Sequence, residues 1–327
     1  MSLSRQGGYR ASPWAIWVAL AAVYLIWGST YLAIRYAVET LPPFLMAGVR
    51  FIVSGAFLYA LRRARGDPAP QARQWASATI IGTLLLVGGN GGVSWAEQFV
   101  ASGLVALLVA TVPLWMVLLD ALRPGGRLPG LRVAAGILIG FAGVVTLVGG
   151  EQARSHSEDV IGAWVVVGAS LLWALGSLFG RAADLPRSPL LGTSMEMLTG
   201  GAALIVLGTL AGEWQELHLA QASARSFLAL GYLVVFGSTG FAAYVWLLRV
   251  APTPLVATYA YVNPLVAVLL GYLLAAEPLT ARTLFAAAAI VGSVALVSGS
   301  AAGGEPRGQK RSLDPKEKIS AGKPPTL

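Results

Sequence analysis

The sequence of 327 residues has no cysteine and little charge, and these two deficits exclude several classes of protein. Without cysteine there can be no disulfide, no thiol nucleophile and no cysteine-ligated metal cluster. Charged residues make up 12% of the chain, about half of the share typical of soluble domains, whereas 56% of the residues are hydrophobic. The two histidines, His156 and His218, both fall in polar connections, so no histidine metal site is expected within the apolar segments.

Enzyme motifs are also missing. The chain has no P-loop, nucleophile elbow, paired carboxylates or metal-ligand spacing, and its Gly-x-Gly fragments lie in apolar runs rather than after a strand. We therefore expect no enzymatic activity, no cofactor and no metal. The net charge of +8 does not indicate a nucleic-acid partner, because its distribution fits the orientation of a membrane protein.

Long apolar segments dominate what remains, and the mean hydropathy is +0.69. A helix needs about 20 predominantly apolar residues to span a bilayer. The pattern predicts an all-α integral membrane protein with ten transmembrane helices. The predicted spans cover residues 14–34, 43–61, 75–96, 101–122, 131–150, 160–180, 190–211, 225–248, 254–276 and 281–300.

Lysine and arginine are distributed unequally between the two sides of the predicted spans. If the N-terminal segment 1–13 is cytoplasmic, 18 of these residues face the cytoplasm and 4 face the opposite side. Because positive charge is retained on the cytoplasmic side, both termini are predicted to be cytoplasmic. The segment 301–327 is basic and rich in glycine and proline, which predicts a disordered tail.

An internal repeat relates the two halves of the chain, 14–150 and 160–300. At an offset of 146 residues Trp27 matches Trp173, and at an offset of 151 Pro113 matches Pro264. Each half contains five spans, an odd number, so the second half enters the membrane from the opposite side. The sequence therefore predicts two inverted five-helix repeats, an arrangement that many secondary transporters use for alternating access.

The repeat also relates two ionisable residues within the spans, since Arg50 and Glu196 occupy equivalent positions. Such residues are costly in hydrocarbon and are functional candidates. One hypothesis is a structural ion pair between them. A second is that Arg50 binds a substrate carboxylate or phosphate, or that Glu196 takes up a proton. In the third, the two residues never meet.

The third span carries four glycines around Asn90, followed by Trp95 and Glu97. This pattern favours either close helix packing or a locally unwound segment with polar lining. Asn90 is then a candidate cavity residue. Glu97, near the outer end of the span, is a weaker candidate for proton coupling, together with Glu196.

Pro113 and Pro264 predict kinked helices at corresponding places in the two halves, because proline removes a backbone donor and clashes one turn earlier. Discontinuous helices at such positions indicate a central binding site. Aromatic and polar side chains near these prolines or on neighbouring spans are then candidates to line the site. They are Trp27, Thr111, Trp115, Trp173, Tyr259, Tyr261 and Asn263, together with Arg50, Asn90, Trp95 and Glu196.

Residues 24–51 contain the strings YLIWGSTY and MAGVRF, and residues 259–264 read YAYVNP. These strings resemble the EamA domain of the drug/metabolite transporter superfamily, and the resemblance extends over about residues 14–300. It implies two EamA domains, a central cavity and ATP-independent export across a bacterial inner membrane. The family often ends its fourth helix with Gly-Glu, a pair echoed by Glu277 in the ninth span, whereas the fourth span here ends near Asp120.

We therefore expect a secondary transporter that exports a small metabolite, amino acid or drug-like compound. The expected partners are this substrate, membrane lipid and, as a candidate coupling ion, the proton. A channel or membrane receptor is the alternative, and a membrane-embedded enzyme is disfavoured because no catalytic constellation can be assembled.

Overall fold

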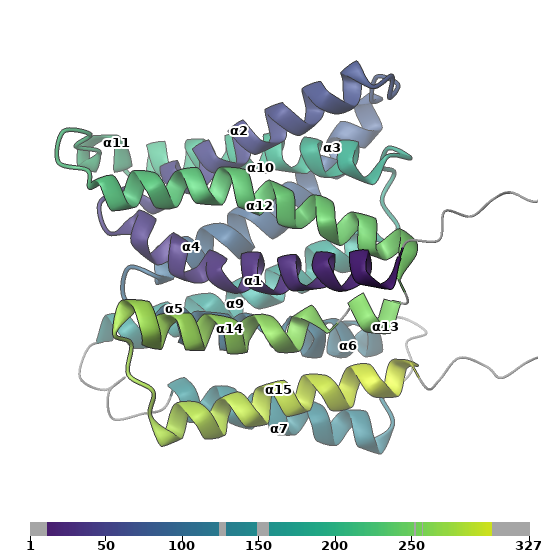
Figure 1. Ribbon diagram of the computed structural model, residues 1–327, viewed down its shortest axis with the longest axis vertical. Helices are drawn as coiled ribbons and strands as arrows, with labels where there is room; N and C mark the ends of the chain where they lie inside the picture. The colour runs from purple at the N-terminus through teal and green to yellow at the C-terminus, as the bar shows by residue number, and fades with distance from the viewer. Residues whose placement is uncertain (1–11, 124–128, 149–156, 252, 257, 303–327) are drawn as a thin grey trace, which may run out of the picture.

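The computed structural model describes residues 12–123, 129–148, 157–251, 253–256 and 258–302, and all of its regular structure within these ranges is helical. Most of the predicted N-terminal segment and of the basic tail lie outside the described residues. The helices lie side by side in a bundle, and α1 begins at the same end at which α15 finishes (Figure 1). We call this the terminal end, and the opposite one, where α1 finishes, the far end.

The first repeat supplies five membrane-length segments, of which the third contains a π-helical stretch and the fourth is interrupted. Its first helix begins at Pro13 behind Ser12, whose side chain accepts a hydrogen bond from the amide of Ala15 and so caps the helix. The segments are α1 (Pro13–Val38), α2 (Pro43–Ala64), α3–η1–α4 (Ala72–Gly82, Thr83–Gly91, Gly92–Ala96), α5–α6 (Ser102–Val109, Val112–Leu122) and α7 (Leu131–Val148).

The second repeat follows the same order, with a short helix α11 added at the far end. Ala276, with a positive φ of 52°, ends the fourth segment of this repeat in the left-handed region. The elements are α9 (Ser157–Gly180), α10 (Pro189–Leu210), α11 (Glu213–Glu216), α12 (Ala224–Val250), α13–α14 (Thr253–Val256, Tyr259–Ala275) and α15 (Ala281–Ala302).

The lengths and composition of these segments suit a bilayer. Seven of the described helical segments are long and apolar enough to cross one, and two further apolar helices are shorter. The helix α12 adds 27 residues. Helices suit this environment because each backbone donor finds its acceptor within the same segment. The architecture is thus the predicted ten-helix membrane fold.

Helix contacts follow the pseudo-two-fold relation between the repeats. The helix α2 packs on α10, α7 on α15, and α5 on α14, so each of these pairs joins equivalent segments. In addition α1 packs on α12 while η1 packs on α9, and these two contacts exchange under the same relation. The repeats are therefore interleaved rather than separate bodies.

The crossing of α2 and α10 is made by small residues. A Cβ added at Gly48 would lie 3.0 Å from the carbonyl oxygen of Gly201, and one added at Gly55 would lie 3.0 Å from that of Ser194. Because Gly48 is equivalent to Ser194 and Gly55 to Gly201, the pseudo-two-fold axis passes midway between these contacts. Close backbone approach at small residues is the usual way in which membrane helices associate.

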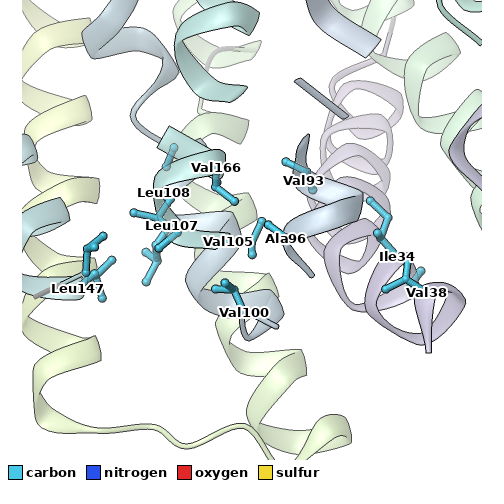
Figure 2. Packing of buried hydrophobic residues seen from close by; sticks show 14 of the residues in the cluster. Ile34, Val38, Val93, Ala96, Val100, Val105, Leu107, Leu108, Leu147 and Val166 are labelled. Atoms are coloured by element: carbon cyan, nitrogen blue, oxygen red, sulfur yellow. The ribbon is translucent and has the colours of Figure 1, made fainter. Parts of the chain in front are cut away.

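The two ends of the bundle have different cores. At the far end one continuous apolar cluster joins eight of the membrane segments, and Figure 2 shows part of it, including Ile34, Val100 and Val166. Towards the terminal end the buried apolar residues form three separate clusters, around Leu20, Leu114 and Leu191. The molecule is sealed at one end and divided at the other.

Candidate functional site

A cavity of about 490 Å³ lies between the two repeats. Its lining extends from Ile34, in the far-end core, to Arg181, an exposed residue at the terminal end of α9. The cavity therefore reaches the terminal end and stops at the far-end core. The sequence candidates among its lining residues are Trp27, Arg50, Asn90, Pro113, Trp173, Glu196, Tyr259, Asn263 and Pro264.

Three aromatic rings form one wall of the cavity. Trp27 lies with its ring centroid 5.1 Å from that of Tyr244 and 5.0 Å from that of Tyr259, and the two tyrosines are 5.5 Å apart. The Trp27–Tyr259 and Tyr244–Tyr259 pairs are edge-to-face, a favourable geometry for aromatic quadrupoles. Such a wall offers apolar contact to an uncharged part of a ligand.

Each repeat places its tryptophan on a glycine of the other repeat. A Cβ at Gly89 would lie 2.6 Å from the ring of Trp173, and one at Gly240 would lie 3.0 Å from the ring of Trp27. The two contacts exchange under the predicted offsets of 146 and 151. These glycines are therefore required for the rings to reach their positions.

The guanidinium of Arg50 reaches the cavity from the middle of α2. Arg50 is 7% exposed, its guanidinium carbon lies 4.8 Å from the ring centroid of Phe51, and its Nη1 has no hydrogen-bond partner among the described residues. A buried donor without an acceptor is unfavourable by about 1–3 kcal/mol, and more for a charged group. An anionic ligand bound in the cavity would provide the acceptor that this nitrogen lacks.

Arg50 and Glu196 line the same cavity but form no ion pair with each other in the described ranges, so the first hypothesis for these residues is wrong for this conformation. The physical reason is the crossing geometry. Arg50 turns towards α12, where its Nη2 lies 3.4 Å from the place of a Cβ on Gly237. The pseudo-two-fold relation turns Glu196 towards the equivalent helix, η1, on the opposite side of the axis.

The glycine-rich part of the third span is a π-helix, η1, rather than an unwound segment. Asn90 lies near its end and lines the cavity, while Gly89 receives Trp173. π-Helical turns are wider than α-helical ones and are frequent at functional sites. The sequence predicted either close helix packing or an unwound segment with polar lining. The structure shows close packing, and Asn90 adds a polar group to the cavity lining.

Five sequence candidates do not line the cavity. Trp95 packs on Phe99 in the far-end core, and Trp115 packs on Phe141. The hydroxyl of Thr111 donates to the carbonyl of Leu108 at 2.6 Å. The remaining two are Tyr261, which packs around the Leu114 cluster, and Glu97, which is buried beyond the cavity at the far end.

The two proline segments are interrupted, but not at equivalent places. In the first repeat the break at 110–111 precedes Pro113, which occupies the first turn of α6, where its missing amide leaves no acceptor unpaired. In the second repeat α14 begins at Tyr259 and Pro264 lies inside it. Both prolines reach the cavity, although only Pro113 directly follows a break.

Two cavity residues that the sequence analysis missed are Tyr31 and Ser177. They are equivalent at the offset of 146, and each follows its repeat's tryptophan, Trp27 or Trp173, by one helical turn. Because residues at i and i+4 share a helix face, this spacing was a usable signal. Tyr244 was missed as well; its equivalent at the offset of 151, Val93, also lines the cavity.

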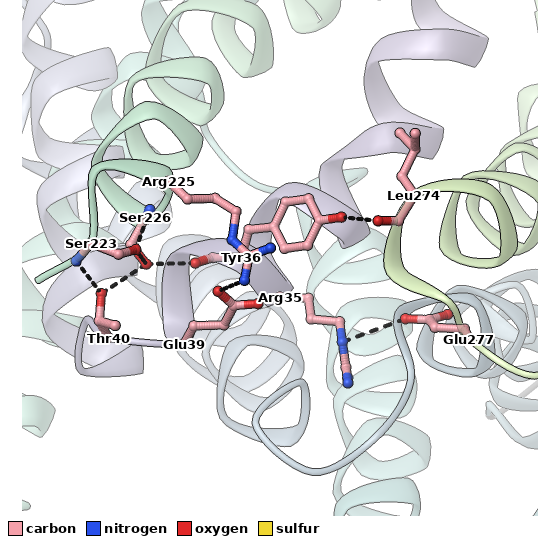
Figure 3. A network of polar contacts seen from close by, with 9 residues as sticks. All are labelled: Arg35, Tyr36, Glu39, Thr40, Ser223, Arg225, Ser226, Leu274 and Glu277. Atoms are coloured by element: carbon pink, nitrogen blue, oxygen red, sulfur yellow. Dashed lines mark hydrogen bonds and ion pairs between the residues drawn. The ribbon is translucent and has the colours of Figure 1, made fainter.

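The far end is closed by polar contacts between the repeats as well as by its core. Glu277 of the second repeat accepts hydrogen bonds from the amides of Ser102 (2.7 Å) and Gly103 (3.0 Å), and from the Ser102 hydroxyl (2.8 Å). These contacts cap the N-terminus of α5, where negative charge is favoured. Arg35 lies beside the same carboxylate, with Nε 3.6 Å from Oε1 (Figure 3).

Further contacts of this network join α1 to α12 and α14. The Tyr36 hydroxyl donates to the carbonyl of Leu274 at 2.7 Å, and Arg225 forms an ion pair with Glu39. The Ser226 hydroxyl donates to the Tyr36 carbonyl at 2.7 Å (Figure 3). The last turn of α1 is thus fixed to both neighbours in this conformation. No group of acidic or histidine side chains that could hold a metal occurs in the described ranges.

Comparisons with known proteins agree with this architecture. The model of the EamA-like transporter family matches residues 12–149 and again 160–299. The chain is 42% identical over 286 residues to the uncharacterized inner membrane transporter YedA of Escherichia coli K12, covering 86% of this chain and 89% of YedA. It is 23% identical to the uncharacterized transporter YvbV of Bacillus subtilis 168, over 85% and 90% of the two chains.

A solved crystal structure superposes with a TM-score of 0.58, covering 89% of this chain and 99% of that one. The sequence identity is 23%, so this likeness supports the fold alone.

Proposed function

Since the chain belongs to the EamA-like transporter family, we propose that it is a secondary transporter that exports a small organic molecule across a bacterial inner membrane. In this proposal both termini are cytoplasmic, as the lysine and arginine distribution predicts, so the cavity faces the cytoplasm. The far end then faces the opposite compartment. Alternating access would interchange the sealed and divided ends, which the inverted repeats allow because their contacts exchange.

The observation that carries this proposal is the buried guanidinium of Arg50, whose Nη1 has no partner among the described residues, in the same one-ended cavity as the aromatic wall. A guanidinium prefers carboxylate or phosphate groups, and the wall of Trp27, Tyr244 and Tyr259 suits an apolar portion. We therefore expect a cargo with an anionic group and an apolar body. Glu196, in the same cavity, provides a place for a cationic group of the cargo or for a proton.

A channel is the alternative class, and the apolar core at the far end does not favour it. A channel needs a continuous polar path, whereas the cavity stops at an apolar cluster that includes Ile34 and Val93. A counterflow assay distinguishes a carrier from a channel. Proteoliposomes loaded with unlabelled cargo should accumulate labelled cargo transiently if the protein is a carrier, and should not if it is a channel. An enzyme would release an altered product.

The first experiment is a thermal-shift screen of the purified protein against amino acids, carboxylates, sugar phosphates and cationic drugs. A ligand present at about 100 times its Kd stabilises the folded state by about 2.7 kcal/mol. We expect anionic compounds to stabilise the native protein and Arg50→Met to lose that shift. Arg225→Met, which changes an exposed arginine of the far-end network, should retain it. A cargo that binds equally well to Arg50→Met would contradict the role of Arg50.

A further inference from the structure

Glu97 is a buried carboxylic acid at the far end of the bundle. It follows α4, in the connection to α5, and is 1% exposed. Neither of its carboxylate oxygens has a hydrogen-bond partner within the described ranges. One turn earlier, the hydroxyl of Ser94 is equally buried and also lacks a partner there.

The surroundings of Glu97 are apolar, with a few charged groups at longer range. Ala96, Val100 and neighbouring side chains of α9 belong to the far-end core. Four groups interact electrostatically with Glu97, and they come from three other parts of the fold. They are Tyr31 and Arg35 of α1, Arg50 of α2 and Glu277 after α14.

The nearby cations are not in position to neutralise Glu97. Arg35 donates from Nη1 to the carbonyl of Val100 at 3.1 Å and directs Nε to Glu277. Arg50 stacks on Phe51 and forms no ion pair among the residues that the structure describes. Glu97 therefore has two cations in its vicinity and a salt bridge to neither.

An ionised carboxylate without water or a donor is strongly disfavoured, so such groups take up a proton instead. Burial raises the pKa of Glu97 well above its ordinary value, and the charge of Glu277 raises it further, while Arg35 and Arg50 act in the opposite direction. Opening of the far end would admit water to this carboxylate and remove the main cause of the shift.

We propose that Glu97 is a proton-binding site that controls the far end of the cavity. The carboxylic acid is neutral while that end is sealed, and it releases its proton to the adjoining solution when the end opens. Closure takes the proton up again. The acid therefore favours the sealed conformation at low pH, and this contribution is lost as the pH rises through the pKa of the sealed state.

The proton site acts at one end only. At the offset of 151 the residue equivalent to Glu97 is Leu248, and the one equivalent to Glu277 is Gly126. The sequence therefore has no acid at either equivalent position, so the proposed proton site has no counterpart in the other repeat. If the protein exports its cargo as proposed above, a proton is exchanged on the side at which the cargo leaves.

The absence of native cysteine allows a direct test without any cargo. Ala37→Cys places a thiol in the far-end core, where Ala37 is fully buried, and Gln98→Cys places one on the exposed surface of the same end. Both are labelled in detergent with a charged methanethiosulfonate reagent across the pH range. The ratio of the two rates removes the pH dependence of the thiol itself and reports opening of the far end.

In the native background we expect this ratio to rise at least tenfold with increasing pH. Glu97→Gln, which cannot ionise, should keep the ratio low at every pH, whereas Glu97→Asp should retain the rise with a displaced midpoint. The proposal is overturned if Glu97→Gln still shows the rise. Should Glu97→Gln fail to fold, an unchanged midpoint in Glu97→Asp would overturn it equally.

Glu196→Gln tests the other candidate proton site, because Glu196 lines the cavity but lies away from the far-end core. It should leave the pH response intact. If it abolishes the response instead, the proton site is Glu196 and the assignment to Glu97 is wrong. Because labelling uses no cargo, failure of this test is distinguishable from failure of the proposed transport function.

Discussion

The two ends of the bundle are built from equivalent helices, yet only some of the carboxylates that bind these helices are equivalent. Glu213 and Asp67 are separated by the repeat offset of 146. Glu213 accepts from the amides of Phe44 and Leu45 at 3.0 and 2.8 Å, at the start of α2. Asp67 accepts from Ser188, which precedes α10. Each end therefore has one acid that holds the first turn of an equivalent helix.

Glu277 differs from this matched pair, because it has no acidic counterpart 151 residues earlier. It binds the N-terminus of α5 and lies beside Arg35, so it joins the repeats at the far end alone. Acids present in both repeats support a common scaffold. An acid present in one repeat gives one end a property that the other lacks, here a preference for the sealed form.

Glu277→Ala should remove this preference of the far end for the sealed form, and it should have the largest effect of the substitutions. The substitution removes the cap of α5 and leaves Arg35 without its carboxylate, which we expect to lower the free energy of unfolding by about 2 kcal/mol. Labelling of Ala37→Cys should become at least tenfold faster. Glu216→Ala, which removes an exposed acid from the same end, should change neither quantity. Unchanged labelling in Glu277→Ala would show that the core alone seals this end.

Arg50 lines the cavity, and its removal should have a smaller effect on stability, of opposite sign. Arg50→Met deletes a buried charge with an unpaired donor and should raise the free energy of unfolding by about 1 kcal/mol. Arg62→Met is the control, because Arg62 donates twice to Asp67 at 2.8 Å and its loss should destabilise the protein. Chemical unfolding of both variants tests this, and destabilisation by Arg50→Met would contradict it.

The matched acids should show the smallest effects, with opposite dependence on pH. Hydrogen bonds from Arg62 and Ser188 hold the pKa of Asp67 below its ordinary value, so the deficit of Asp67→Asn should shrink as the pH falls through that range. Burial raises the pKa of Glu213, so the native protein should lose stability relative to Glu213→Gln as the pH rises. Melting temperatures between about pH 3 and 8 measure both, and parallel trends would refute the assignment.

The repeat and the ten spans could be predicted from the sequence, because tryptophan and proline at constant offsets are rare coincidences in apolar sequence. The same offsets did not predict contacts. They made Arg50 and Glu196 equivalent, and equivalent side chains on crossing helices point to opposite sides of the axis. The role of Glu277 depends on a difference between the repeats, so a search for matches could not find it. The isolation of Glu97 depends on which donors fail to reach it, which only the packed structure reveals.

The glycine crossing of α2 and α10 has a mechanical consequence. The helices cross between the contact of Gly48 with Gly201 and that of Gly55 with Ser194, near the middle of their lengths, and Ile205 and Ile52 pack over the glycines there. From the crossing point near Ile52, α2 extends about 18 Å to its end at Ala64, at 1.5 Å for each residue. A tilt of about 10° would displace that end by about 3 Å and the other end in the opposite direction. In the proposed transport cycle, such a tilt would couple the widening of one end of the bundle to the narrowing of the other.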